Sequence, residues 1–252
     1  MRLATFNILH GRSPADGRVD VGRLVEAIRT LDADVLALQE VDRDQPRSEL
    51  ADLTAVAAQA MGAVSYRFAA AVAGTPGAAW IAATGTEQPG SAAYGIALLS
   101  RHPVRSWQVI RLPRIPCRIP VWLREPAKVV VVNEEPRVAL TGVVSGPLGE
   151  MTVVNTHLSF VPGWNVAQLR RLRRNLAPQP EPVLLMGDLN LSDGKPARIT
   201  GYRPLASAPT FPADAPVRQL DHILCRGRLG EVRAVDTPEL PLSDHRPLVV
   251  DL

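Results

Sequence analysis

The sequence predicts an α/β fold in which two mixed β-sheets pack against each other and helices cover the outside. Three amphipathic helices and nine or ten short apolar strands can be traced along the 252 residues. Several strands follow one another through connections too short for a parallel crossover, so the sheets must contain antiparallel pairs. Two packed sheets bury all of these elements, and no repeat or linker divides the chain. We therefore expect a single domain over residues 1–252.

The first third of the chain alternates strands and helices. Residues 2–8 and 34–39 read as strands, and Asp20 precedes a helix that ends near Leu31. The apolar positions of that helix recur at the spacing of one buried face. A second helix is expected to begin at Ser48 and to stop at Gly62.

The rest of the chain is rich in strands. Residues 73–93 carry much Gly, Pro, Ala and Thr and read as a long surface loop that could cover a site. Residues 111–120 hold too many prolines for a central strand and read as an edge or a loop. A helix covers about 165–176. The expected strands are 94–100, 104–110, 129–132, 137–144, 151–156, 183–187, 219–224 and 246–251.

The composition excludes several classes of protein. Hydrophobic residues make up 46% and charged residues 21%, which is typical of a globular chain and not of a disordered, collagen-like or coiled-coil one. No apolar run reaches the roughly 18 residues of a membrane span. The net charge of +3 is mildly basic, well short of that of a nucleic-acid coat protein. Only two of the 28 basic residues are lysines, which indicates a compositional bias.

The first residues and the cysteines favour a cytoplasmic location. The start MRLATFNILHGR reads as a strand followed at once by polar residues, which is not the pattern of a signal peptide. Cys117 and Cys225 are far apart and fit no metal or redox spacing. We therefore expect two unpaired thiols in a cytoplasmic, monomeric protein.

The informative polar residues lie where apolar strands end or begin. Rigid strand ends are a common way to hold side chains in a defined site. The clusters, in chain order, are Asn7; Gln39 and Glu40; Asn155, Thr156 and His157; Asp188 and Asn190; Asp221; and Asp244 and His245.

These residue types favour metal-assisted hydrolysis. Carboxylate and amide oxygens are hard ligands that suit Mg²⁺ or Mn²⁺, and the clusters contain no cysteine. Two histidines beside extra carboxylates suit proton transfer to or from water. Each residue alone would more often be a turn residue, a solvated charge or a core group. Their recurrence at six strand ends predicts a site that hydrolyses a phosphate ester with the help of a metal.

In their order along the chain, these clusters resemble the motifs of the endonuclease/exonuclease/phosphatase superfamily, which is also called DNase I-like. The resemblance spans residues 5–248 and implies a four-layer α/β/β/α sandwich. The matching segments are Thr5-Phe6-Asn7-Ile8, Leu38-Gln39-Glu40-Val41, Gly95-Ile96-Ala97-Leu98-Leu99-Ser100-Arg101, Asn155-Thr156-His157-Leu158, Gly187-Asp188-Leu189-Asn190, Leu220-Asp221-His222-Ile223 and Ser243-Asp244-His245-Arg246-Pro247-Leu248.

The resemblance also implies roles for these positions. Asn7 and Glu40 would bind the Mg²⁺ or Mn²⁺ ion, and Asp244 would add a further or water-mediated ligand. His157 and Asn190 would hold the phosphate of the substrate. Asp188 would orient or deprotonate the attacking water, and His245 would pair with Asp221. Whether Asp188 or His245 is the general base stays open. The candidate catalytic residues are His157, Asp188, Asn190, Asp221 and His245.

The substrate is less well defined than the chemistry. We expect a divalent-metal-dependent phosphoesterase acting on a phosphodiester or a phosphomonoester of modest size. A DNA or RNA nuclease is the alternative, although the only dense basic run is Arg170–Arg174. A sphingomyelinase-like lipid phosphodiesterase would need a membrane-contacting apolar hairpin, and the sequence does not show one clearly. An inactive scaffold of the same fold is disfavoured, because every site position holds a competent residue.

Some polar residues are expected to have structural roles only. His222 would point to the opposite face from Asp221 in a regular strand. Arg170–Arg174 read as a solvated helix face, and Trp164 as an anchor near the site. Glu87 lies in the long loop without a motif around it.

Overall fold

The computed structural model describes residues 1–87, 90–116, 118–123, 128–192 and 194–252. Cys117 lies outside the described residues, and Cys225 is a buried thiol without a disulfide partner among them. In the described part of the chain, no helix is both long and apolar enough to cross a membrane.

The first sheet is mixed. β1 and β2 pair in parallel, and the other neighbours pair antiparallel. In the described part of the chain it has the order β14-β15-β1-β2-β5-β3-β4, with the bounds β1 Arg2–Asn7, β2 Val35–Arg43, β3 Ser65–Gly74, β4 Trp80–Ala82, β5 Ala93–Ser100, β14 Ala234–Asp236 and β15 Leu248–Asp251.

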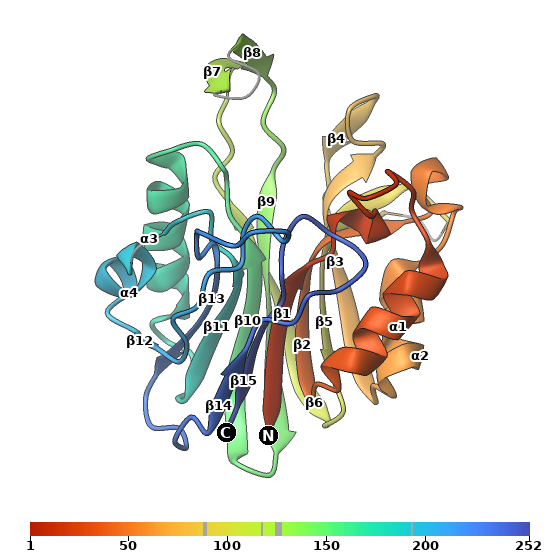
Figure 1. The fold of residues 1–252 in the computed structure, drawn as a ribbon. Coiled ribbons are helices and arrows are strands. Elements are labelled where there is room, and N and C mark those ends of the chain that lie inside the picture. The colour runs from red at the N-terminus through yellow and green to blue at the C-terminus, as the bar shows by residue number, and fades with distance from the viewer. Residues whose placement is uncertain (88–89, 117, 124–127, 193) are drawn as a thin grey trace.

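The second sheet is also mixed, with β10 and β11 in parallel. A separate hairpin of β7 (Ile119–Leu123) and β8 (Lys128–Val132) projects beyond the end of the sandwich in Figure 1. The described strands of the second sheet have the order β12-β13-β11-β10-β9-β6, with the bounds β6 Val104–Leu112, β9 Arg137–Gly146, β10 Gly149–His157, β11 Val183–Asp188, β12 Arg203–Pro204 and β13 Asp221–Arg226.

Helices lie outside both sheets, so the fold is the predicted four-layer α/β/β/α sandwich (Figure 1). α1 (Val21–Leu31) and α2 (Leu53–Met61) cover the first sheet, and α3 (Trp164–Leu176) and α4 (Lys195–Thr200) cover the second. Two short 3-10 turns, η1 (Leu9–Gly11) and η2 (Pro46–Ser48), follow β1 and β2. Apolar side chains fill three interfaces: between the sheets, and between each sheet and its helices.

The structure corrects several expected boundaries. The second helix begins at Leu53 and not at Ser48, because the Asp52 carboxylate accepts the Ala55 N–H and caps it. The expected loop 73–93 contains the end of β3, all of β4 and the start of β5. The segment 111–120 likewise contains the end of β6 and the start of β7. β3 was not predicted, because its strand-forming Tyr66 and Phe68 are followed by alanines that show no clear alternation.

The topology brings six strand ends together. β1, β2, β10 and β11 run so that their carboxyl ends meet at one end of the sandwich. β5 is antiparallel to β2, and β9 is antiparallel to β10, so these two strands begin at that same end. Both the ends and the beginnings of strands can therefore supply side chains to one site.

Candidate active site

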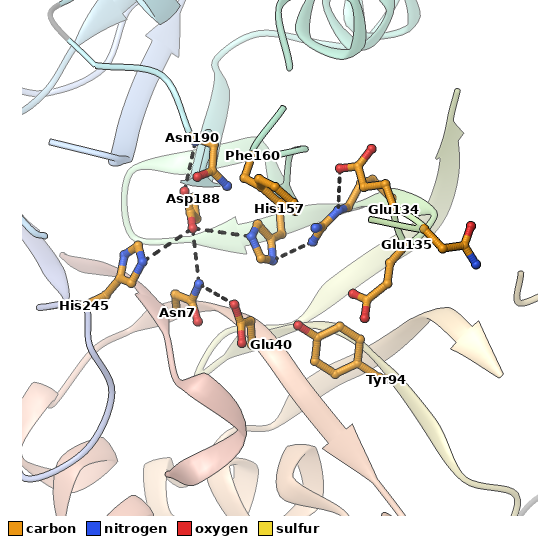
Figure 2. Close-up of a pocket in the computed structure, with 12 residues that line it drawn as sticks. Asn7, Glu40, Tyr94, Glu134, Glu135, His157, Phe160, Asp188, Asn190 and His245 are labelled. Atoms are coloured by element: carbon orange, nitrogen blue, oxygen red, sulfur yellow. Dashed lines mark hydrogen bonds and ion pairs between the residues drawn. The ribbon is translucent and has the colours of Figure 1, made fainter. Parts of the chain in front are cut away.

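A pocket of about 300 Å³ opens at this end of the sandwich, and both sheets contribute to it. Figure 2 shows how its side chains converge. The pocket is lined by Asn7, Glu40, Tyr94, Asn133, Glu134, Glu135, Arg137, His157, Phe160, Asp188, Asn190 and His245. Six of the eight expected site residues are therefore brought together here, and Asp221 and Asp244 are not among the lining residues.

Glu40 is turned into the pocket by a β-bulge. The pairing of β2 with β5 changes register between Leu38 and Val41, and Glu40 has a φ of 55°. Burial raises the pKa of the Glu40 carboxyl, although a hydrogen bond from Asn7 opposes this shift. In the described chain Asn7 is its one hydrogen-bond donor, at 3.1 Å from Oε1. A half-buried carboxylate with a single hydrogen bond within the described chain is well suited to hold a cation, which would keep it ionised.

Asn7 connects the two sheets. Its Nδ2 donates to Glu40 Oε1 and, at 3.2 Å, to Asp188 Oδ2. Its Oδ1 accepts the Leu9 N–H at 3.1 Å. The amide therefore presents nitrogen to the two carboxylates, and it would have to rotate about its last bond to offer oxygen to a metal beside Glu40.

Asp188 lies at the centre of the site. Gly187 before it has a φ of 138°, and its α-carbon passes so close to the Thr156 carbonyl that a side chain could not fit. Asp188 Oδ1 accepts the Asn190 N–H, and Oδ2 lies 3.4 Å from His157 Nε2 and 3.8 Å from His245 Nε2. Burial raises the pKa of Asp188 to about 7, although the neighbouring His245 charge opposes the shift. A pKa near the working pH suits a general base.

Asp221 lies behind His245. Its Oδ2 accepts from His245 Nδ1 at 2.8 Å and from the Thr210 hydroxyl at 2.6 Å, and its side chain is fully buried. Burial alone would lower the pKa of His245, but the charge and hydrogen bond of Asp221 raise it to about 10. His245 is therefore a cation at neutral pH, with Nε2 directed at Asp188.

Arg137 helps to keep His157 neutral, in contrast to the charged His245. The Arg137 Nη1 lies 3.1 Å from His157 Nδ1, and both side chains are buried. A guanidinium can only donate, so Nδ1 must be the acceptor and the proton of the neutral ring must be on Nε2. Burial, and then the Arg137 charge, lower the pKa of His157 well below its usual value. His157 is therefore neutral, with its Nε2–H directed into the pocket.

The remaining expected residues differ in their position. Asn190 lines the pocket, and its Nδ2 donates to the Leu158 carbonyl at 3.0 Å, which leaves its second amide hydrogen for another acceptor. Asp244 is half-buried beside the pocket, and its charge raises the pKa of both Glu40 and His245. The Asp244 carboxylate therefore affects the site electrostatically, although Asp244 does not line the pocket.

The donor set fits a divalent cation at Glu40. The pocket offers carboxylate and amide oxygens and no cysteine among its described residues, which matches the preference of Mg²⁺ or Mn²⁺. A second group, Asp188 with Asp221 and His245, has its ligand atoms within 4.8 Å of one another. In that group Asp221 Oδ2 already accepts from His245 Nδ1, whereas Glu40 accepts a hydrogen bond only from Asn7 within the described chain.

The sequence analysis did not identify four residues that line the pocket at the start of a strand or just before that start. Tyr94 lies at the start of β5, and Arg137 is the first residue of β9, with Glu134 and Glu135 just before it. Most of the clusters that the sequence shows lie at the carboxyl ends of strands, whereas these four residues do not. A polar or aromatic residue at the start of an antiparallel neighbour would have been the signal, because that start lies beside the functional end.

The residues expected to be structural have such roles. His222 Nε2 lies 2.7 Å from the Leu191 carbonyl, away from the pocket. Trp164 Nε1 donates to the Pro113 carbonyl at 3.0 Å, which anchors the start of α3. Glu87 lies outside the pocket, and its carboxylate accepts hydrogen bonds from Thr84 and Gly85 in its own loop.

The fold and this site define a class of protein, and comparison with known proteins identifies the family. The chain matches the endonuclease/exonuclease/phosphatase family over residues 4–245, so it belongs to that family of phosphate-ester hydrolases. Comparison with curated proteins gave no match.

Solved structures share the whole sandwich. An endonuclease/exonuclease/phosphatase from Beutenbergia cavernae is 26% identical with a TM-score of 0.73, covering 99% of this chain and 70% of its own. Sphingomyelinase C from Streptomyces griseocarneus is 17% identical with a TM-score of 0.61, covering 99% and 98%. A mannosyl-6-phosphatase from Bacteroides thetaiotaomicron is 15% identical with a TM-score of 0.61, covering 100% and 98%. At the identities of the last two, the similarity shows the fold alone.

Proposed function

We propose that the protein is a Mg²⁺- or Mn²⁺-dependent phosphoesterase that hydrolyses a phosphodiester or phosphomonoester by attack of an activated water. One observation carries this proposal. A single pocket holds an under-compensated carboxylate at Glu40, a carboxylate of raised pKa at Asp188, a charged His245 and a neutral His157. This combination suits binding of a cation, deprotonation of water and stabilisation of charge on phosphate.

Glu40 is the proposed main metal ligand, with Asn7 as the second. Rotation of the Asn7 amide would turn Oδ1 toward Glu40, at the cost of the hydrogen bond from Leu9. Asp244 is proposed to act through a water or as a further ligand. A divalent cation bound there would neutralise charge on the phosphate oxygens.

Asp188 is the proposed general base. His245 is less suited to that role, because a group of pKa about 10 is already protonated at neutral pH. We assign His245 instead to an electrostatic role, in which its Nε2–H orients Asp188 and the attacking water. Asp221 is a positioning residue that fixes the imidazole and keeps it charged through Nδ1.

His157 and Asn190 are proposed to bind the phosphate oxygens. Both offer a hydrogen to the pocket, His157 through Nε2 and Asn190 through its free amide hydrogen. Charge grows on these oxygens in the transition state, so the two donors stabilise it more than the ground state. Loss of one such donor typically lowers the rate by about 10²–10³.

A panel of phosphate esters tests this proposal. Bis-p-nitrophenyl phosphate, p-nitrophenyl phosphate, DNA and RNA would each be incubated with Mg²⁺, Mn²⁺ or EDTA. We expect hydrolysis of a small ester that EDTA and Glu40→Gln abolish. Degradation of nucleic acid under the same controls would make the protein a nuclease, with the exposed Arg170–Arg174 face as a candidate backbone contact. Hydrolysis that persists in EDTA would contradict the metal dependence.

The β7–β8 hairpin favours a second candidate, a lipid phosphodiesterase. The hairpin projects at the end of the sandwich that holds the pocket (Figure 1), and Val129 and Val131 on one face of β8 are 58% and 64% exposed. Exposed apolar side chains on a projecting hairpin suit contact with a membrane surface. The strand expected at 129–132 is β8, whereas β7 was not predicted, because the proline-rich stretch hides its start.

Vesicle sedimentation tests this candidate. Phosphatidylcholine–sphingomyelin vesicles should bind the protein, and Val129→Ser with Val131→Ser should weaken that binding while hydrolysis of p-nitrophenyl phosphate stays unchanged. Equal sedimentation of both proteins would remove the lipid candidate. We also propose one domain over residues 1–252 and a monomeric, cytoplasmic protein; size-exclusion chromatography with light scattering tests the monomer.

A further inference from the structure

A second cavity, of about 430 Å³, lies between the edges of the two sheets and shares no lining residue with the candidate active pocket. It collects three arginines from three strands: Arg43 from the end of β2, Arg67 from β3 and Arg111 from β6. We call it the arginine cavity. It is also lined by apolar residues of β3 and β6, namely Phe68, Ala69, Ala70 and Val109.

The cations of this cavity are poorly compensated. Arg67 and Arg111 have no hydrogen bond or ion pair within the described residues. Arg43 lies over the Phe68 ring at 5.0 Å, and its buried Nε has no hydrogen-bond partner among the described residues, with Asp44 3.9 Å away. Arg67 and Arg111 are exposed and Arg43 is half-buried, and like charges that line one cavity repel one another, so an anion bound there would lower the electrostatic energy.

Glu87, the acidic residue among the described residues that line the cavity, does not neutralise these arginines. Glu87 lines the cavity, but its carboxylate is taken up by the N–H groups of Thr84 and Gly85 and by the Thr84 hydroxyl. No ion pair joins it to an arginine of the described chain. The cavity thus keeps an excess of positive charge. Glu87 instead stabilises its own loop, whose residues Thr84 and Gly85 also line the cavity.

We propose that the arginine cavity binds a phosphate-type oxyanion other than the phosphate that is hydrolysed. Guanidinium groups donate in a planar fork that matches the oxygens of phosphate, and they stay charged at all working pH values.

The cavity lies next to the active pocket. Arg111 pairs with Val138, the neighbour of Arg137 on β9, and Ala70 pairs with Gly95, the neighbour of Tyr94 on β5. The oxyanion can therefore be a second phosphate of the substrate or a free phosphate ion that occupies the cavity independently.

Binding of inorganic phosphate to the protein in EDTA tests the site without turnover. The active pocket also holds Arg137 and a cationic His245, so the binding that belongs to the cavity is read from the difference between the unaltered protein and a variant of the cavity arginines. We expect saturable binding that Arg67→Gln with Arg111→Gln weakens by about tenfold or more. The matched control, Arg170→Gln with Arg174→Gln, removes two exposed charges from α3 and should bind as the unaltered protein does.

Absence of binding to the unaltered protein, or equal weakening in both double variants, would overturn the proposal. Circular dichroism and melting temperature verify that each variant is folded. The outcome is independent of the proposed function, since no step of the assay needs catalysis.

Kinetics then identify the source of the anion. If it is a second phosphate of the substrate, the cavity variant raises KM for a sugar bisphosphate and leaves KM for p-nitrophenyl phosphate unchanged. If it is a free ion, added phosphate changes the kcat for p-nitrophenyl phosphate in the unaltered protein and not in the cavity variant. Identical behaviour of the cavity variant and the unaltered protein in both assays would contradict a functional site.

Discussion

Replacing Arg137 with methionine tests whether this residue sets the protonation state of His157. Methionine has a similar length and is apolar, so the variant removes the donor that lies 3.1 Å from His157 Nδ1 without leaving a large void. Nδ1 of the imidazole would then accept no hydrogen bond from residue 137, so the tautomer with the proton on Nε2 would no longer be favoured. Its pKa should also rise toward the ordinary value of 6.5, since the Arg137 charge is the second cause of its depression after burial.

The expected loss follows from the role of Arg137 as a positioning residue. Removal of a group that orients a functional histidine typically costs about 10–100-fold, which corresponds to roughly 1.4–2.7 kcal/mol of transition-state stabilisation. Below its new pKa a larger fraction of His157 becomes charged and again carries a proton on Nε2, so the loss of activity relative to the unaltered protein should shrink on acidification. The assay is kcat/KM for bis-p-nitrophenyl phosphate as a function of pH, together with ¹⁵N NMR of the imidazole nitrogens.

Glu134 provides the control. Its carboxylate is 1% exposed and lies 3.8 Å from Arg137 Nε, so Arg137→Met leaves a buried charge without its partner and should destabilise the fold. Arg137→Met with Glu134→Gln removes that charge, and Glu134→Gln alone keeps the contact to His157. A double variant with the Nε2–H tautomer intact and kcat/KM within about twofold of Glu134→Gln would refute the reasoning. Lost activity with an unchanged tautomer would instead make Arg137 a direct ligand of the phosphate.

Three further predictions concern the metal, His245 and the backbone before Asp188. Glu40→Gln should abolish Mn²⁺ binding in calorimetry and with it the hydrolysis, a loss of turnover of roughly 10²–10³ or more, with no loss of folding stability, because a half-buried charge with one hydrogen bond is removed. Asp221→Asn should lower the pKa of His245 from about 10. The raised pKa of His245 stabilises the folded protein fully below the unfolded value of 6.5, and this stabilisation is lost as the pH rises through about 10. The free energy of unfolding should therefore fall less between neutral and alkaline pH in the variant than in the unaltered protein. Gly187→Ala would place its β-carbon 1.9 Å from a backbone oxygen and should cost about 3 kcal/mol or more in urea denaturation, whereas Gly230→Ala, with no atom within 4 Å, should cost less than about 0.5 kcal/mol. Equal effects of the two glycine variants would contradict this account of the close approach.

The sequence predicts the sandwich well where side chains carry periodic information. The helix 21–31 and the strands that end at Asn7, His157 and Asp188 are found within a residue or two of their expected bounds. Short or alanine-rich elements such as β3 and α4 carry too little pattern to be recognised, and their structure depends on packing against the rest of the fold. The start of α2 was misplaced because both Ser48 and Asp52 are good caps, and only the tertiary contacts select one of them.

The candidate site was predictable in its residues and not in its electrostatics. Motif spacing leads to Glu40, His157 and Asp188, because strand ends are visible in the sequence. The opposite charge states of the two histidines depend on which group contacts each ring, Arg137 for His157 and Asp221 for His245. Those contacts join distant segments, so they are defined by the sheet pairing and cannot be read from local spacing.

The central claim is that Glu40 holds the metal on which hydrolysis depends. The most direct measurement titrates Mn²⁺ into the metal-free protein while both binding and hydrolysis of a small phosphate ester are followed. The account predicts that activity rises in proportion to the bound fraction in the unaltered protein, and that Glu40→Gln shows neither binding nor activity. A Glu40→Gln protein that binds Mn²⁺ and hydrolyses the ester as the unaltered protein does would contradict it.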